Sequence, residues 1–145
     1  MKQHKHNTLF RLLAALMCLM AVTALCACQP KSAEGLWADA LYTKDTELGS
    51  GSVTVTAEVE VEDKTVRFTV HTDASTVGDA LQGAGILEGE AGPYGLYIKR
   101  VNGMLADYDA DQTYWAFYIG SDYGMTGVDL TPIADGEIYR FVYSK

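Results

Sequence analysis

Tyr114-Trp115-Ala116-Phe117-Tyr118-Ile119-Gly120 is followed by Thr126-Gly127-Val128-Asp129-Leu130 and then by Asp135-Gly136-Glu137-Ile138-Tyr139-Arg140-Phe141-Val142-Tyr143. Runs of aromatic and β-branched residues are typical of strands, and an Asp-Gly pair is typical of the turn that precedes one. This C-terminal stretch therefore predicts an aromatic strand, a glycine-broken loop and a second aromatic strand. We expect the rest of the chain to pack against this unit.

The two strands carry more rings than one core face needs. Alternation places Trp115, Phe117 and Ile119 on one face of the first strand, and this more apolar set predicts that Trp115 belongs to the core. If the second strand lies beside the first, we expect a tyrosine-rich outer face made of Tyr114, Tyr118, Tyr139 and Tyr143, with Tyr123 in the adjoining loop. Tyrosine suits ligand surfaces because it offers apolar area and a polar tip, but it is also simply a good strand former.

The residues upstream of this unit predict a hairpin and a helix. Between Val53 and Val70 apolar residues alternate with Thr, Glu and Arg, with a turn at Asp63-Lys64, which indicates two paired strands. From Thr72 to Gly85 the apolar residues fall at helical spacing, and Gly83 and Gly85 end the helix. A turn-rich loop follows from Glu88 to Pro93, and a third strand is predicted from Tyr94 to Val101.

The predicted order is strand, strand, helix, strand, strand, strand. A hairpin followed by a helix and further strands is the connectivity of the β-grasp class. We therefore predict an α+β domain with a mixed sheet of about five strands and one short helix packed on one face.

The N-terminus has the form of an export signal. Lys2, Lys5 and Arg11 precede an uncharged, mostly apolar run from Leu12 to Leu25, which is too short to span a membrane as a helix. The run ends in Leu25-Cys26-Ala27-Cys28, which resembles the lipobox of bacterial lipoproteins. A small residue before the cut and a thiol after it predict residues 1–27 as a lipoprotein signal peptide and Cys28 as the lipidated mature N-terminus. The alternative is a plain secretory signal with a chance cysteine.

Residues 28–50 are predicted to be the lipidated cysteine and a flexible spacer, and residues 51–145 the folded domain. The spacer contains Pro, Ser, Thr and Gly and shows no sustained periodicity. Trp37 is the one anomaly in this spacer. It can dock on the domain, but we expect a solvated linker residue.

Charge and residue content exclude several functions. From residue 49 onward there are six basic and fifteen acidic residues, which makes nucleic-acid binding improbable. All three cysteines precede residue 29, so no disulfide framework is expected in the domain. No nucleophile, base or phosphate-binding motif is present, and we expect no enzymatic activity. Asp107, Asp109 and Asp111 resemble the start of a calcium loop but lack its Gly and Glu, so an acidic turn is predicted and no metal site.

Several short motifs together resemble one known family. They are Thr76-Val77-Gly78-Asp79-Ala80-Leu81, Tyr114-Trp115, Gly127-Val128-Asp129, Pro132 and Asp135-Gly136-Glu137-Ile138. In this order they are similar to the transcobalamin-like C-terminal domain, the β-rich module that closes the cobalamin site in transcobalamin and intrinsic factor. The resemblance covers nearly all of residues 53–143 and implies a soluble-ligand-binding β-grasp fold.

The resemblance implies a function as well as a fold. In those carriers a helical barrel supplies most of the cobalamin-binding surface, and this chain lacks the barrel, so a partner protein is implied for the other half of a site. We expect a surface-tethered lipoprotein module, anchored outside a bacterial membrane, that binds a soluble ligand without a covalent bond. A corrinoid is the leading ligand, and the expected contacts are Tyr114, Tyr118, Tyr123, Tyr139 and Tyr143, with Trp115 as a secondary choice. The alternative is a protein- or glycan-interaction module with no small-molecule ligand.

Overall fold

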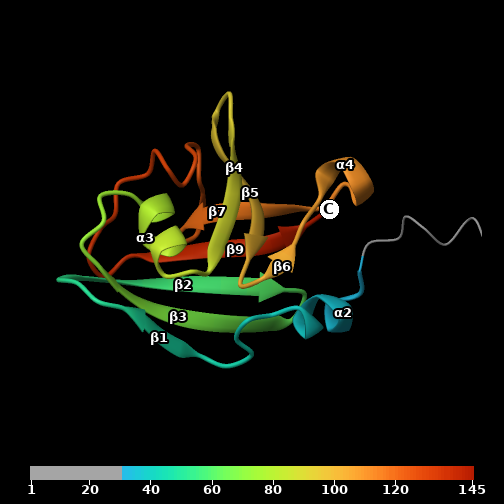
Figure 1. Ribbon diagram of the computed structural model, residues 1–145, viewed down its shortest axis with the longest axis horizontal. Coiled ribbons are helices and arrows are strands. Elements are labelled where there is room, and N and C mark those ends of the chain that lie inside the picture. The colour runs from blue at the N-terminus through green and yellow to red at the C-terminus, as the bar shows by residue number, and fades with distance from the viewer. Residues whose placement is uncertain (1–30) are drawn as a thin grey trace, which may run out of the picture. The chain divides into compact units, whose positions relative to one another are not determined.

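A computed structural model describes residues 31–145, which form a compact unit (Figure 1). The predicted signal peptide, residues 1–27, and the predicted lipidation site Cys28 lie outside the described residues. Within residues 31–145 there is no helix long and apolar enough to cross a membrane.

The largest element is a mixed six-stranded sheet with strand order β1-β3-β2-β9-β7-β8. Its centre is the predicted hairpin of β2 (Val53–Val61) and β3 (Lys64–Thr72), which pairs through β2 with β9 (Ile138–Ser144). β7 (Tyr114–Ile119) pairs with β9, and β8 (Asp122–Tyr123) pairs with β7. The hairpin turn is Glu62-Asp63, one residue earlier than predicted, and Glu62 adopts a φ of 55° to make it.

The core lies on one face of this sheet. Alternate residues of β2 and β3 point into it and are almost fully buried: Val55, Ala57, Val59, Val61, Val66, Phe68 and Val70. The predicted helix is present as α3 (Val77–Gly83), capped by the Thr76 hydroxyl, and contributes Val77 and Leu81 to the same core. The α+β class is therefore confirmed.

A second sheet, which was not predicted, joins α3 on the core. It contains β4 (Leu87–Gly92), β5 (Gly95–Val101) and β6 (Met104–Leu105), and Figure 1 shows β4 and β5 running across the direction of β2 and β9. The predicted single sheet of about five strands is wrong, because residues 88–92 are a strand and not a loop. Glycine is unfavourable inside strands, so Gly89 argues against a strand when only the sequence is considered. The structure nevertheless requires glycine there, because an added Cβ would lie 2.5 Å from the Tyr97 carbonyl oxygen.

The predicted flexible spacer is also wrong for residues 33–49. Helix α2 (Ala33–Ala38) buries Leu36 in the core, and β1 (Thr46–Gly49) adds a parallel edge strand to β3. Between them the buried Asn102 side chain accepts a hydrogen bond from Tyr42 N at 2.9 Å and donates one to Tyr42 O at 2.8 Å. The folded unit thus begins well before residue 51.

Trp37 is part of this docked segment. Its ring packs against the core, and the Lys64 ammonium lies 4.1 Å from the ring centroid. The expectation of a solvated linker residue is therefore wrong.

Candidate functional site

The predicted outer face of four tyrosines does not exist, because Tyr139 faces the core. The register places Tyr139 opposite Ile119 on the inner face, and its side chain is 1% exposed. Its ring stacks on Phe117 at 6.2 Å, and its hydroxyl accepts a hydrogen bond from Ala134 N at 3.0 Å. Burial raises the pKa of Tyr139, the bond from Ala134 lowers it, and nearby Glu137 raises it.

Trp115 and Tyr143 form a second inner-face pair. They lie opposite each other in the β7–β9 register and make an edge-to-face contact at 5.3 Å. The Trp115 indole donates to Met104 O at 3.2 Å, so the expectation that Trp115 belongs to the core is met. Burial is the main cause of the raised pKa of Tyr143, whose hydrogen bond with Thr113 acts in the opposite direction.

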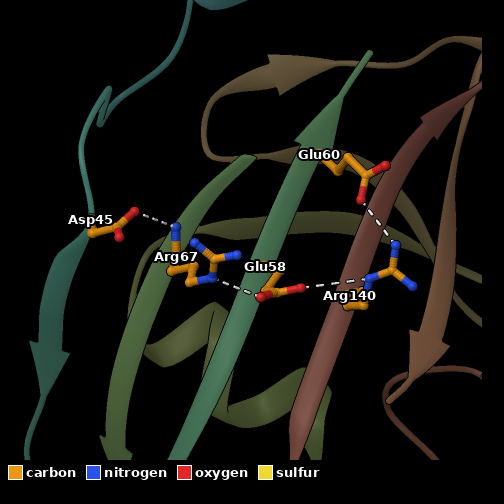
Figure 2. A network of polar contacts seen from close by, with 5 residues as sticks. All are labelled: Asp45, Glu58, Glu60, Arg67 and Arg140. Carbon is orange, nitrogen blue, oxygen red and sulfur yellow. Dashed lines mark hydrogen bonds and ion pairs between the residues drawn. The ribbon is translucent and has the colours of Figure 1, made fainter. Parts of the chain in front are cut away.

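The true outer face carries Tyr118 and Tyr123. These two face each other across β7 and β8 with ring centroids 5.3 Å apart, and the Arg140 guanidinium lies 5.5 Å from the Tyr118 ring. The same face also carries a network of charged side chains, which Figure 2 shows. Arg140 binds Glu60 at 2.9 Å and Glu58 at 3.5 Å, and Glu58 binds Arg67 at 2.8 Å.

Tyr114 lines a pocket whose other residues were not predicted. The pocket has a volume of about 580 Å³ and is lined by Tyr97 of β5, Tyr108 and Asp109 of α4 (Tyr108–Asp111), and Tyr114 of β7. Tyr97 is 40% exposed and Tyr108 is 55% exposed, so two of its three rings are open to solvent. The Lys99 ammonium lies 5.0 Å from the Tyr97 ring. This open pocket offers three aromatic surfaces, hydroxyl groups and a carboxylate.

The alternation of apolar residues on β5 indicates that the Tyr97 side chain points away from the core. On β5 the neighbours Leu96 and Ile98 pack on the core, so alternation alone directs Tyr97 away from it. Tyr108 gave no such signal, because it lies on a four-residue helix with no periodicity of its own.

The acidic segment before β7, which was predicted to be an acidic turn, forms the start of helix α4. The Asp107 carboxylate accepts hydrogen bonds from Asp109 N at 3.2 Å and Ala110 N at 3.3 Å, as an N-cap does. Within residues 31–145 no three His, Cys, Asp or Glu side chains lie close enough to hold a metal ion.

A second, charged pocket lies beside the first. It has a volume of about 290 Å³ and is lined by residues of β4, β5 and the following segment: Glu88, Gly89, Glu90, Lys99, Arg100, Leu105 and Asp107. Lys99 pairs with Asp107 and Arg100 pairs with Glu88, each at 3.9 Å. Two of its three acidic residues are thus paired with its two basic residues.

The motif residues around α3 hold the fold together. Gly78 N donates to Val128 O at 2.8 Å, and Val77 N donates to Thr131 O at 3.0 Å. The Asp135 carboxylate accepts from Thr54 N at 2.8 Å and fixes the turn before β9. These contacts join α3 and β2 to the loop between β8 and β9.

No protein-family model and no curated protein matches the sequence. Among solved structures, haptocorrin in complex with Cbi matches with a TM-score of 0.54 and 22% identity over 64% of this chain. The match spans 25% of the haptocorrin chain, so the matched part of this chain corresponds to about a quarter of that protein and shares its fold there.

A second solved structure is more similar in sequence. It is a "putative metal binding protein" from Ruminococcus gnavus ATCC 29149, with a TM-score of 0.61 and 30% identity over 65% of this chain and 98% of that chain. At this identity, across nearly the whole length of a protein whose fold it shares, the chain belongs to the same family as the Ruminococcus gnavus protein.

Proposed function

We propose that this protein is an exported lipoprotein whose folded unit binds a soluble ligand without a covalent bond, with a corrinoid as the leading candidate. The observation that carries the proposal is the pocket formed by Tyr97, Tyr108 and Tyr114. We further infer a β-grasp type of fold from the hairpin, helix and strand order.

The chemistry of the pocket suits a ligand with both apolar and polar surface. Its volume of about 580 Å³ falls in the range of small-molecule sites. Aromatic rings supply contact area at low cost in side-chain entropy. Tyrosine hydroxyls can donate or accept hydrogen bonds at the rim, and the Asp109 carboxylate can accept them. A corrinoid has a broad apolar ring edged with amide groups, which fits such a surface.

The openness of the pocket also indicates incomplete burial of the ligand. The haptocorrin chain is about four times the length of its match to this chain and was solved in complex with Cbi. A ligand that contacts one face only loses less water-exposed area and binds more weakly. We therefore propose that a partner protein supplies the opposite surface.

Tethering would keep this weak binder where its ligand arrives. Lipidation at Cys28 would anchor the unit to the outer face of the bacterial cell membrane. Replacing Cys28→Ser tests this part separately, because the exported chain should then leave the membrane fraction, and the mass of the native chain should show the acyl groups.

Equilibrium dialysis of residues 31–145 against cobalamin and cobinamide tests the ligand. Corrinoid absorbance reports binding directly and avoids interference with protein fluorescence. We expect a higher ligand concentration on the protein side at micromolar ligand. Equal concentrations up to the high micromolar range would rule out the corrinoid.

A second function is favoured by the outer face of the large sheet. There Tyr118 and Tyr123 lie beside the charged row of Arg140, Glu58 and Arg67. A sheet face that combines aromatic and charged side chains suits docking of a protein or a glycan. In that case Tyr123→Ala would abolish partner binding and no corrinoid would be retained.

A further inference from the structure

Helix α2 follows the proposed lipid anchor within a few residues, where the sequence had predicted a flexible spacer. Helix α2 starts at Ala33 and its N-cap is Ser32, only four residues after Cys28. Four fully extended residues span at most about 14 Å. A flexible spacer through residue 50 would instead leave the ends about 25 Å apart on average and free to swing.

Helix α2 is held firmly enough to act as the fixed end of this tether. Leu36 is buried in the core, and the Lys64 ammonium covers the Trp37 ring at 4.1 Å. After the helix, Leu41 N donates to Asn102 O at 2.9 Å, so the segment is pinned on both sides. Lys31 pairs with Asp39, which brings the first described residue back onto the helix.

We propose that the lipidated protein lies against the bilayer with its α2 end toward the lipid, and does not swing on a long tether. The inference rests on the proposed lipidation of Cys28 and identifies the partner of this surface as the membrane itself. The surface consists of α2, the Glu62-Asp63 turn beside Lys64, and the end of β9. It carries Lys31 and Lys64 as well as Glu62 and Asp63, so the short tether sets the orientation and net charge does not.

The tyrosine pocket borders this same end. Figure 1 shows α2, α4 and the C-terminus at one end of the molecule. In agreement, Asp111 of α4 and Lys31 both lie close enough to the Tyr143 hydroxyl to influence its pKa. Tyr108 and Tyr114 lie on either side of Asp111 in the chain, so a ligand in the pocket is held next to the bilayer.

Opposite ends of β2 give a direct test. Ser50 and Asp63 are both exposed and lie beyond the two ends of this nine-residue strand, roughly 26 Å apart along its axis. Cys28 is blocked by lipid in the mature lipoprotein, so Ser50→Cys and Asp63→Cys each provide a single site for a thiol-reactive fluorophore. The purified full lipoprotein is reconstituted in phosphatidylcholine vesicles that carry a quencher on the lipid headgroup.

We expect several-fold stronger quenching of the label at position 63 than at position 50. A control protein with 20 Gly and Ser residues inserted between Pro30 and Lys31 has a tether of about 25 Å and should lose this difference while remaining folded. Equal quenching at the two positions in a chain shown by mass to be lipidated would overturn the orientation alone. A mature chain without lipid at Cys28 would overturn the proposed tethering, and this inference with it.

Discussion

The Tyr139 hydroxyl fastens the last strand to the loop that precedes it. It accepts a hydrogen bond from Ala134 N and lies 3.4 Å from Pro132 O as a donor, inside an otherwise apolar core. Removing it by Tyr139→Phe leaves the Ala134 amide without this partner and should cost about 1 kcal/mol of the free energy of unfolding. Urea denaturation measures the loss. Tyr123→Phe removes the same atom from an exposed ring and should leave the free energy of unfolding unchanged.

The buried tyrosines also predict a dependence of stability on alkaline pH. Burial raises the pKa of Tyr139 and Tyr143 above the ordinary tyrosine value of 10.0. Above pH 10.0 the unfolded chain therefore binds fewer protons than the folded one, and the free energy of unfolding falls as pH rises through the folded pKa values. Urea denaturation on both sides of pH 10.0 measures this fall. The slope should be shallower in Tyr139→Phe, and an unchanged slope would contradict the assignment.

Arg140 explains why the face of Tyr139 was predicted wrongly. Alternation correctly separates the residues of β9 into two sets, but it does not say which set is buried. A charged side chain is rarely buried without a partner, so Arg140 marks its own face as the outer one and sends Tyr139 and Tyr143 inward.

At the scale of elements, α2 and β1 make the folded unit longer than the predicted 51–145. A chain that begins at Gly51 loses the buried Leu36. It also loses Tyr42, the hydrogen-bond partner of both the oxygen and the nitrogen of the Asn102 side-chain amide. Loss of a buried leucine side chain alone costs at least about 2 kcal/mol. We expect the chain of residues 51–145 to unfold at a much lower urea concentration than residues 31–145. Equal midpoints would show that α2 and β1 contribute no stability.

Helix α3 depends on the absence of a side chain at Gly78. An added Cβ would lie 3.0 Å from the Asp129 backbone, closer than the loop can accept without moving. Gly78→Ala should therefore destabilise the protein, although alanine favours a helix over glycine by about 1 kcal/mol. Gly83→Ala is the matched control, because its added Cβ meets no atom within 4 Å. The midpoint temperature of thermal unfolding should fall for Gly78→Ala and should stay level or rise for Gly83→Ala.

The elements that could be predicted are those with a regular apolar pattern. The β2–β3 hairpin, α3, β5, β7 and β9 follow period 2 or helical spacing closely enough to be located from the residues alone. β4 was missed because Gly89 and Gly92 interrupt it, and α2 because it spans less than two turns. α2 is fixed by the burial of Leu36 in the core and β4 by its pairing with β5, and a local pattern contains neither contact.

At the scale of the whole molecule, the pocket combines residues from the second sheet, the large sheet and α4. Tyr97 from the second sheet and Tyr108 from α4 meet Tyr114 around an open volume. Of these three residues only Tyr114 was predicted, because the pocket exists only once the two sheets and α4 are brought together. The proposed anchor at Cys28 would place this pocket at the membrane end of the protein.

The central claim is that these rings bind the ligand, and one set of dialysis experiments tests it most directly. The variants Tyr108→Ala, Tyr123→Ala and Tyr94→Ala remove the same side chain from the pocket, the outer face and the exposed β4–β5 hairpin tip. We predict that Tyr108→Ala weakens cobinamide binding by about 1 kcal/mol, or roughly fivefold, and that the other two bind as the native chain does. Unchanged binding in Tyr108→Ala, together with loss of binding in Tyr123→Ala, would contradict the account.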